Sequence, residues 1–91
     1  MAALRIIVEG KVQGVGFRAW TVAEACRLGL RGMVRNRRDG SVEVHVAGDP
    51  AQLDPFMHSL NAGPRAAVVT RLTSTPAPDP GPGGFVQAPT V

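Results

Sequence analysis

The pattern of hydrophobic and polar positions changes its period along the chain. Leu4, Ile6 and Val8 alternate with other residues, which is typical of a β-strand with one buried face. From residue 19 the apolar residues recur at helical spacing instead. That stripe consists of Ala19, Val22, Ala23, Cys26 and Leu30. We therefore expect a helix that ends at Gly29, where a left-handed conformation costs little, and a buried thiol at Cys26.

Two strands joined by a tight turn are predicted next. The first covers about residues 32–38 and carries Asn36 on the same face as its central valine. Asp39-Gly40 is a strong hairpin signal, because both residue types tolerate a positive φ. In the returning strand alternate valines face inward, so Glu43 and His45 are expected to face solvent.

A second helix and two more strands complete the pattern. Asp49 is a good helix N-cap and Pro50 suits the first helical position, while Gly63-Pro64 ends the helix. Strands are predicted over 68–72 and, briefly, at Phe85-Val86. The buried face of this helix is expected to carry Leu53, Phe56, Met57 and Leu60.

The order of these elements predicts an α+β fold. Strand-helix-strand-strand-helix-strand, followed by a short C-terminal strand, gives a ferredoxin-like α/β sandwich with two helices on one face of an antiparallel or mixed sheet. Ninety-one residues, 44% of them apolar, fit a single domain over residues 1–91. Residues 75–84 contain half of the eight prolines and indicate a semi-rigid connector rather than a peptide ligand for an SH3-type domain.

Composition narrows the function classes. Ten Lys and Arg against seven Asp and Glu give a net charge of +3, and nine of the ten cations are Arg, which suits either an anionic ligand or a solvated surface. The single Cys26 excludes an internal disulfide framework and a cysteine-based zinc site. With no run of 18 apolar residues and a carboxylate already at Glu9, we expect a cytoplasmic protein without a membrane span or leader.

The segment from Gly10 to Arg18 is the main candidate for chemistry. It joins a strand to a helix N-terminus and has glycines at 10, 14 and 16. Glycines let backbone N–H groups converge on an anion, and the helix adds free N–H groups and a positive dipole end. Arg18 can then form a bidentate pair with phosphate. Tight turns beside a solvated arginine explain the same residues, and both interpretations stay open at this point.

Two general phosphate motifs fit this segment poorly. A P-loop needs a Gly-Lys-Ser/Thr ending, which is absent. The run from Gly14 to Ala19 matches the dinucleotide pattern, and Asp39 lies about 20 residues further on. A hairpin follows that aspartate, however, and the chain is too short for a doubly wound sheet.

Three blocks of sequence carry a family resemblance. They are Val8-x-Gly10-x-Val12-Gln-Gly-Val-Gly-Phe-Arg18, Leu28-Gly-Leu-x-Gly-x-Val34-x-Asn36 and Asp39-Gly-Ser-Val-Glu43. Together they strongly resemble the acylphosphatase family over nearly the whole chain, and Phe56, Leu60 and Gly63-Pro64 also fall where that family has them. The family is ferredoxin-like, in agreement with the order of elements.

The resemblance implies an enzyme that hydrolyses acyl phosphates to carboxylate and inorganic phosphate. By that resemblance Arg18 binds the phosphate and Asn36 orients the attacking water. It also implies no metal and no cofactor, and we expect phosphate, sulfate or chloride as further ligands of the site. A monomer is the default expectation, and the oligomeric state stays open at this point. The phosphate loop, acting mostly through its backbone, would comprise Gln13, Gly14, Val15, Gly16, Phe17 and Arg18.

Alternative functions are weaker. An RNA-binding module of the same fold would need stacking aromatics and a basic signature block, and the chain has one Trp, three Phe and no such block, so we expect no nucleic-acid partner. A phosphate-binding module without turnover is disfavoured because Arg18 and Asn36 are both present. His45 and His58 are interpreted as solvated. Trp20 is expected beside the loop. The cluster of Arg35, Arg37 and Arg38 either steers anions or forms a solvated edge.

Overall fold

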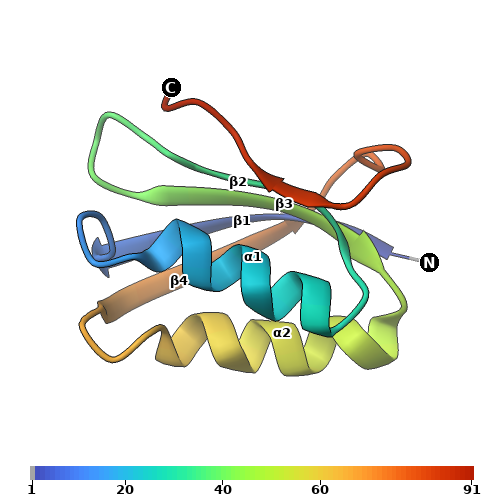
Figure 1. Ribbon diagram of the computed structural model, residues 1–91, viewed down its shortest axis with the longest axis horizontal. Coiled ribbons are helices and arrows are strands. Elements are labelled where there is room, and N and C mark those ends of the chain that lie inside the picture. The colour runs from blue at the N-terminus through green and yellow to red at the C-terminus, as the bar shows by residue number, and fades with distance from the viewer. Residues whose placement is uncertain (1) are drawn as a thin grey trace.

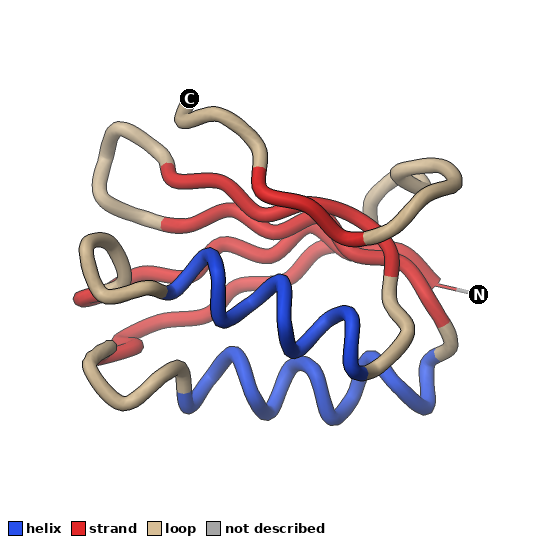
Figure 2. The backbone as a smooth tube through the Cα atoms, viewed as in Figure 1, coloured by secondary structure: helices blue, strands red, loops and turns tan. Residues whose placement is uncertain are grey.

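The computed structural model describes residues 2–91 and has two layers, a sheet and a pair of helices on one of its faces (Figure 1). The strands are β1 (Ala2–Lys11), β2 (Arg31–Asn36), β3 (Val42–Gly48), β4 (Val68–Pro76) and β5 (Phe85–Gln87), and the helices are α1 (Phe17–Arg27) and α2 (Pro50–Ala62). This is the predicted element order and the predicted ferredoxin-like arrangement. Figure 2 shows that loops occupy both ends of the sheet, outside the helical layer.

The sheet topology decides which segments meet. The strand order is β4-β1-β3-β2-β5; β1 pairs antiparallel with β3 and β4, and β3 pairs antiparallel with β2. The short β5 pairs parallel with β2. The carboxyl ends of β1, β2 and β5 therefore lie at the same end of the sheet. That end receives the glycine-rich loop after β1, Asn36 at the end of β2 and Gln87 at the end of β5.

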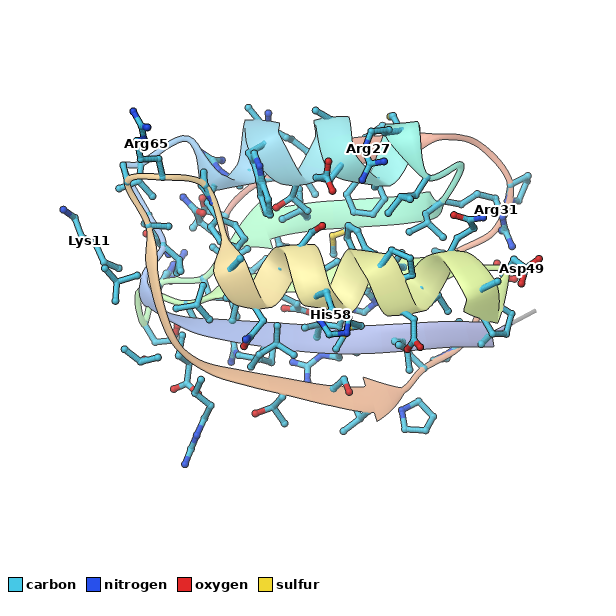
Figure 3. All side chains as sticks on the ribbon, turned by 90° about the horizontal axis from the view of Figure 1, so that it is seen from below. Lys11, Arg27, Arg31, Asp49, His58 and Arg65 are labelled. Atoms are coloured by element: carbon cyan, nitrogen blue, oxygen red, sulfur yellow. The ribbon has the colours of Figure 1, made fainter. Side chains whose placement is uncertain are left out.

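The core lies between the sheet and the helices. It contains the alternate valines of β3, Ile6 and Val8 of β1, and the predicted apolar face of α2, of which Phe56 is fully buried. The α2 boundaries agree with their sequence signals. The Asp49 side chain accepts a hydrogen bond from the Ala51 N–H at 2.9 Å, and Gly63 ends the helix at φ 70°. Figure 3 shows Asp49 at the start of α2 and His58 on its outer surface.

The buried face of α1 differs from the prediction. It consists of Phe17, Thr21 and Ala25, whereas Ala23 and Cys26 are exposed, so the expectation of a buried thiol is wrong. Alanines give a helix little directional preference, so the large Phe17 ring determines which side is buried. The Thr21 hydroxyl is tolerated there because it donates a hydrogen bond to the Phe17 carbonyl at 2.8 Å.

The end of α1 follows its sequence signal. Gly29 has a φ of 70°, and its N–H donates to the Cys26 carbonyl at 3.1 Å. The Leu30 N–H donates to the Ala25 carbonyl at 2.9 Å. These two bonds form a Schellman motif, which satisfies the last helical carbonyls and turns the chain into β2.

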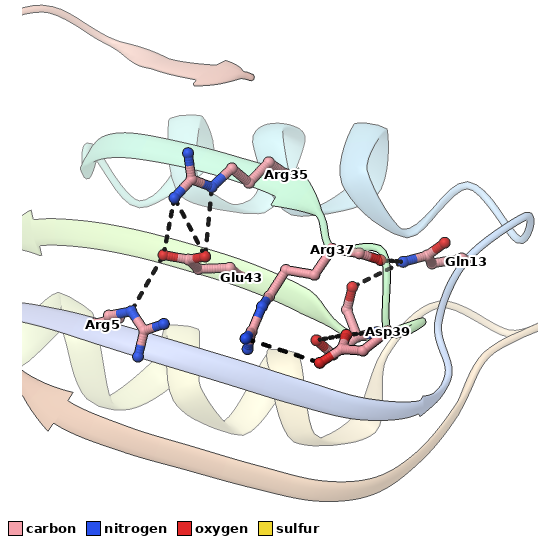
Figure 4. A network of polar contacts seen from close by, with 7 residues as sticks. Arg5, Gln13, Arg35, Arg37, Asp39 and Glu43 are labelled. Atoms are coloured by element: carbon pink, nitrogen blue, oxygen red, sulfur yellow. Dashed lines mark hydrogen bonds and ion pairs between the residues drawn. The ribbon is translucent and has the colours of Figure 1, made fainter. Parts of the chain in front are cut away.

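The face of the sheet opposite the helices holds a buried carboxylate. Glu43 and His45 point to that face as expected, but the prediction that both are solvated is wrong, because Glu43 is only 3% exposed. Arg5 from β1 and Arg35 from β2 cover it, with nitrogen–oxygen distances of 3.2 and 3.3 Å (Figure 4). His45 Nε2 lies 2.6 Å from its Oε2. The long side chains of these two arginines, on neighbouring strands, exclude solvent from the carboxylate. The alternation of apolar and polar residues within one strand does not reveal such pairing.

The proline-rich connector is tied to the sheet. β4 runs on to Pro76, further than predicted, and the connector then leads to β5, where Phe85 pairs with Gly32. Asp79 forms an ion pair with Arg31 at 2.8 Å and accepts the Gly81 N–H at 2.8 Å. These contacts lie at the start of β2, at the end of the sheet away from Asn36. Neither helix is long and apolar enough to cross a membrane within residues 2–91.

Candidate active site

The loop between β1 and α1 forms one wall of a small cavity. Gly14 and Gly16 have φ values of 73° and 76°, a region that other residues rarely adopt, and Gly16 is the N-cap of α1. No side chain of the described residues caps this helix end. The Trp20 N–H donates to the Gly16 carbonyl at 3.1 Å, so the N–H groups of the preceding helical residues have no intrahelical acceptor. They are available to an anion.

The cavity has a volume of about 140 Å³. It is lined by Val12, Gln13, Gly14, Gly16, Phe17, Arg18, Ala19, Asn36 and Gln87. Sites for drug-sized ligands have roughly 300–1,000 Å³, so this one suits a phosphoryl group with a small substituent.

Gln13 holds the loop in place. Its side-chain Nε2 donates to the carbonyl oxygens of Arg37 and Ser41, at 2.7 and 2.8 Å (Figure 4). The turn that presents those carbonyls is itself closed by Asp39, whose side chain accepts from the Ser41 N–H at 2.9 Å and the Ser41 hydroxyl at 2.6 Å. The side-chain nitrogen of Gln13 is therefore committed to the hairpin, so the backbone N–H is the donor that Gln13 has left for an anion.

Arg18 lies in the first turn of α1 and lines the cavity. Its side chain is partly buried, and over residues 2–91 no hydrogen bond or ion pair engages it. By contrast, the arginines on the opposite face, Arg5 and Arg35, are paired with Glu43. Arg18 therefore retains its full capacity for a bidentate pair with a phosphoryl group.

Asn36 supplies the second polar side chain of the cavity. Its Oδ1 is buried and has no hydrogen-bond partner in the part of the chain that the structure describes. Its backbone is fixed, because its carbonyl accepts the Val91 N–H at 3.1 Å. Buried polar atoms in proteins are almost always paired, so an unpaired amide oxygen on a residue that lines a cavity indicates a partner that comes from outside the protein chain.

The structure brings together most of the residues predicted from the sequence. Arg18 and Asn36 line one cavity with the loop, apart from Val15, which is partly buried against the core and does not line it. Trp20 lies beside the loop as expected, with its ring centroid 5.5 Å from that of Phe17.

Three lining residues were missed from the sequence: Val12, Ala19 and Gln87. Val12 and Ala19 flank the predicted loop and could have been found by extending it at both ends. Gln87 could not, because its place depends on the pairing of β5 with β2 after the irregular connector.

Comparison with known proteins identifies the family. The acylphosphatase family model matches residues 4–86. The chain is 46% identical over 87 residues to an acylphosphatase of Acidiphilium cryptum, with 96% of each chain covered, and 43% identical over 91 residues to an acylphosphatase of Rhodospirillum rubrum, with both chains covered in full. The crystal structure of acylphosphatase from Bacillus subtilis matches with a TM-score of 0.93 at 37% identity, covering 97% of this chain and 99% of that chain. The chain therefore belongs to the acylphosphatase family and hydrolyses acyl phosphates.

Proposed function

We propose that the loop of residues 13–18 binds the phosphoryl group of the substrate, that Arg18 pairs with its oxygens, and that Asn36 orients the attacking water. The observation that carries this proposal is that Asn36 and Arg18 line one cavity, while neither the buried Oδ1 of Asn36 nor the guanidinium of Arg18 has a partner within residues 2–91. The free N–H groups of the first turn of α1 and the left-handed glycines of the loop support it further.

Hydrolysis of an acyl phosphate needs little acid–base catalysis. The bond between phosphorus and the acyl oxygen breaks with its electron pair on that oxygen, and the leaving carboxylate is stable without a proton. The protein's contribution is then to position the reactants and to stabilise charge on the phosphoryl oxygens. Arg18 performs the second task, because its guanidinium is a cation whose N–H donors match two phosphoryl oxygens at once.

Asn36 aligns the nucleophile. Its Oδ1 accepts a hydrogen bond from water, which directs a lone pair of the water oxygen at phosphorus. A neutral amide is too weak a base to take a proton from water, so the proton of the attacking water passes to a phosphoryl oxygen of the substrate. A new bond between the water oxygen and phosphorus forms as the acyl oxygen leaves, and the products are carboxylate and inorganic phosphate.

The proposal extends to the cofactor requirement, the oligomeric state, the location and the anion ligands of the enzyme. Because Arg18 and the loop supply the positive charge, hydrolysis proceeds without a metal or cofactor. Residues 1–91 act as one domain and as a monomer in the cytoplasm, and inorganic phosphate, sulfate or chloride occupies the loop in the absence of substrate. Sedimentation across protein concentrations tests the monomer, and competitive inhibition by each anion tests the ligands.

The first experiment follows benzoyl phosphate by absorbance in buffer that contains EDTA. We expect rapid hydrolysis by the wild type and a loss in kcat/KM of at least ~10²–10³ for Arg18→Ala, typical of removing one preorganised donor. Asn36→Ala should lower kcat with a smaller change in inhibition by phosphate. The matched control is Arg71→Ala, which removes an exposed arginine on β4. An Arg18→Ala variant within fivefold of wild type excludes Arg18 from the site, and equal losses of phosphate binding and turnover in Asn36→Ala exclude the water-orienting role.

A further inference from the structure

Gln87 contributes a side chain to the cavity from the edge of the sheet. It is the last residue of β5 and pairs with Val34 of the neighbouring β2. Phe85, two positions earlier, is buried in the core on the helix-covered face, so the period of the strand directs Gln87 to that same face. Figure 1 shows β5 beside β2 and above α1, with its carboxyl end directed toward the loop.

The backbone around Gln87 is anchored. The Ala88 N–H donates to the Val34 carbonyl at 2.9 Å, directly after Gln87 in the chain. The Val91 N–H donates to the Asn36 carbonyl at 3.1 Å, so the segment beyond β5 follows the edge of β2 up to the site. The position of Gln87 relative to Asn36 is therefore set by strand pairing.

The exposure of the lining residues indicates where a substrate extends. Val12 and Phe17 are buried and close the interior, whereas Gly14, Gly16, Ala19 and Gln87 are exposed and form the mouth. Of these four, Gln87 alone carries a side chain with hydrogen-bonding groups. Its side-chain amide is not engaged in a hydrogen bond with any residue in the range 2–91.

We propose that Gln87 is a specificity-determining residue that contacts the acyl group. This inference rests on the proposed function, because a phosphoryl group held at the loop leaves the side of the mouth formed by Gln87 to the acyl group. An amide offers one acceptor and two donors. Gln87 therefore favours acyl phosphates whose carbonyl carries a small hydrogen-bonding substituent, such as an amino or hydroxyl group, over apolar acyl groups of equal size.

Two substrates of the same size test this directly. Carbamoyl phosphate and acetyl phosphate differ only in an NH₂ group where the other has CH₃. The measured quantity is the ratio of their kcat/KM values in wild type and in Gln87→Leu, which keeps the size of the side chain but removes its polar atoms. We expect the carbamoyl-to-acetyl ratio to fall about fivefold to tenfold in the variant, the effect of one hydrogen bond.

The matched control is Val86→Ala. Val86 is the preceding residue of β5, is 56% exposed and lies on the opposite face of the strand, so this variant should keep the wild-type ratio. An unchanged ratio in Gln87→Leu overturns the inference. If both kcat/KM values fall by the same factor, Gln87 is instead a ligand of the water or the phosphoryl group. Arg18→Ala, assayed in parallel, separates the two proposals. Its full activity would overturn both, whereas its inactivity beside an unchanged ratio in Gln87→Leu would overturn only the assignment of Gln87.

Discussion

Gln13 is joined to Arg37 by a hydrogen bond of 2.7 Å from the side-chain Nε2 to the backbone carbonyl oxygen. The same nitrogen reaches the Ser41 carbonyl at 2.8 Å. Arg37 directly follows Asn36, so these bonds couple the loop that precedes Arg18 to the end of the strand that carries the second site residue. The distance between the two halves of the site therefore depends on a side-chain nitrogen that is bonded to the hairpin and is not offered to the ligand.

Replacing Gln13 tests whether its side chain couples the loop to the end of β2. Gln13→Leu removes two hydrogen bonds, although each carbonyl keeps one backbone donor, the Gly40 N–H for Arg37 and the Arg37 N–H for Ser41. At about 0.5–1.5 kcal/mol for each lost bond, we expect the free energy of unfolding to fall by about 1–3 kcal/mol. The displaced loop should also lower kcat, about tenfold, in molecules that remain folded. Urea titrations and assays below the unfolding transition measure the two effects. Gln52→Leu, on the exposed side of α2, is the control. A destabilised variant with wild-type kcat would show that loop and strand are positioned independently.

Asn36 is predicted to reduce stability while serving the reaction. Its Oδ1 is buried without a partner, and asparagine is disfavoured in strands. We expect Asn36→Val to leave the free energy of unfolding unchanged or to raise it by about 1 kcal/mol, although the variant loses turnover. Thermal and urea unfolding check this. A loss above about 1 kcal/mol would mean that the amide is a structural group with partners in the fold.

The sequence was sufficient for the elements whose signals are local. Asp49 and Gly63 set the ends of α2, and the alternating valines set β3, because each signal acts within a few residues. Arg18 was already a candidate because it follows the glycine-rich loop at the start of a helix, whereas the role of Asn36 came from the resemblance. The topology brings both residues into one cavity.

The predictions that were wrong or missing concern contacts between segments that are distant in the sequence. The buried side of α1 follows from the packing of Phe17, which the weak pattern of its alanines did not reveal, and Cys26 was misassigned for that reason. Glu43 is buried only because Arg5 and Arg35 come from two other strands. Gln87 reaches the site through the pairing of β5, which no local signal fixes.

Glu43 should make stability depend on acidic pH. Burial of its carboxylate raises the pKa, but hydrogen bonds from His45, Arg35 and Arg5 more than offset this and lower the pKa from 4.5 to about 2. Because the folded state binds this proton less readily than the unfolded state, the contribution is complete above pH 4.5. It is lost as the pH falls from there toward 2, and its full size is on the order of 3 kcal/mol.

The contribution of Glu43 can be isolated by comparing unfolding of wild type and Glu43→Gln in urea between pH 7 and pH 2.5. Other acids titrate in both proteins, so the difference between them reports Glu43. We expect the wild type to be more stable at pH 7 and the two curves to converge toward the acid end. A difference that stays constant with pH would mean that the carboxylate is not held by its cationic neighbours.

Gly10 is predicted to be required by close packing of the backbone. Its φ is 127°, it lies at the irregularity where β1 shifts register against β4, and a Cβ atom there would collide with the carbonyl oxygen of Val68. Gly10→Ala should therefore cost at least about 2 kcal/mol of stability, since backbone has to move. Gly81→Ala is the matched variant: its φ of 93° is also unfavourable, but the space around it is open, so only the conformational cost of about 1 kcal/mol applies.

Gly10 does not line the cavity of Arg18, so the folded fraction of Gly10→Ala should keep the kcat of wild type. Equal destabilisation by the two variants would remove the steric explanation, and a fully stable Gly10→Ala with low kcat would instead assign this glycine to catalysis.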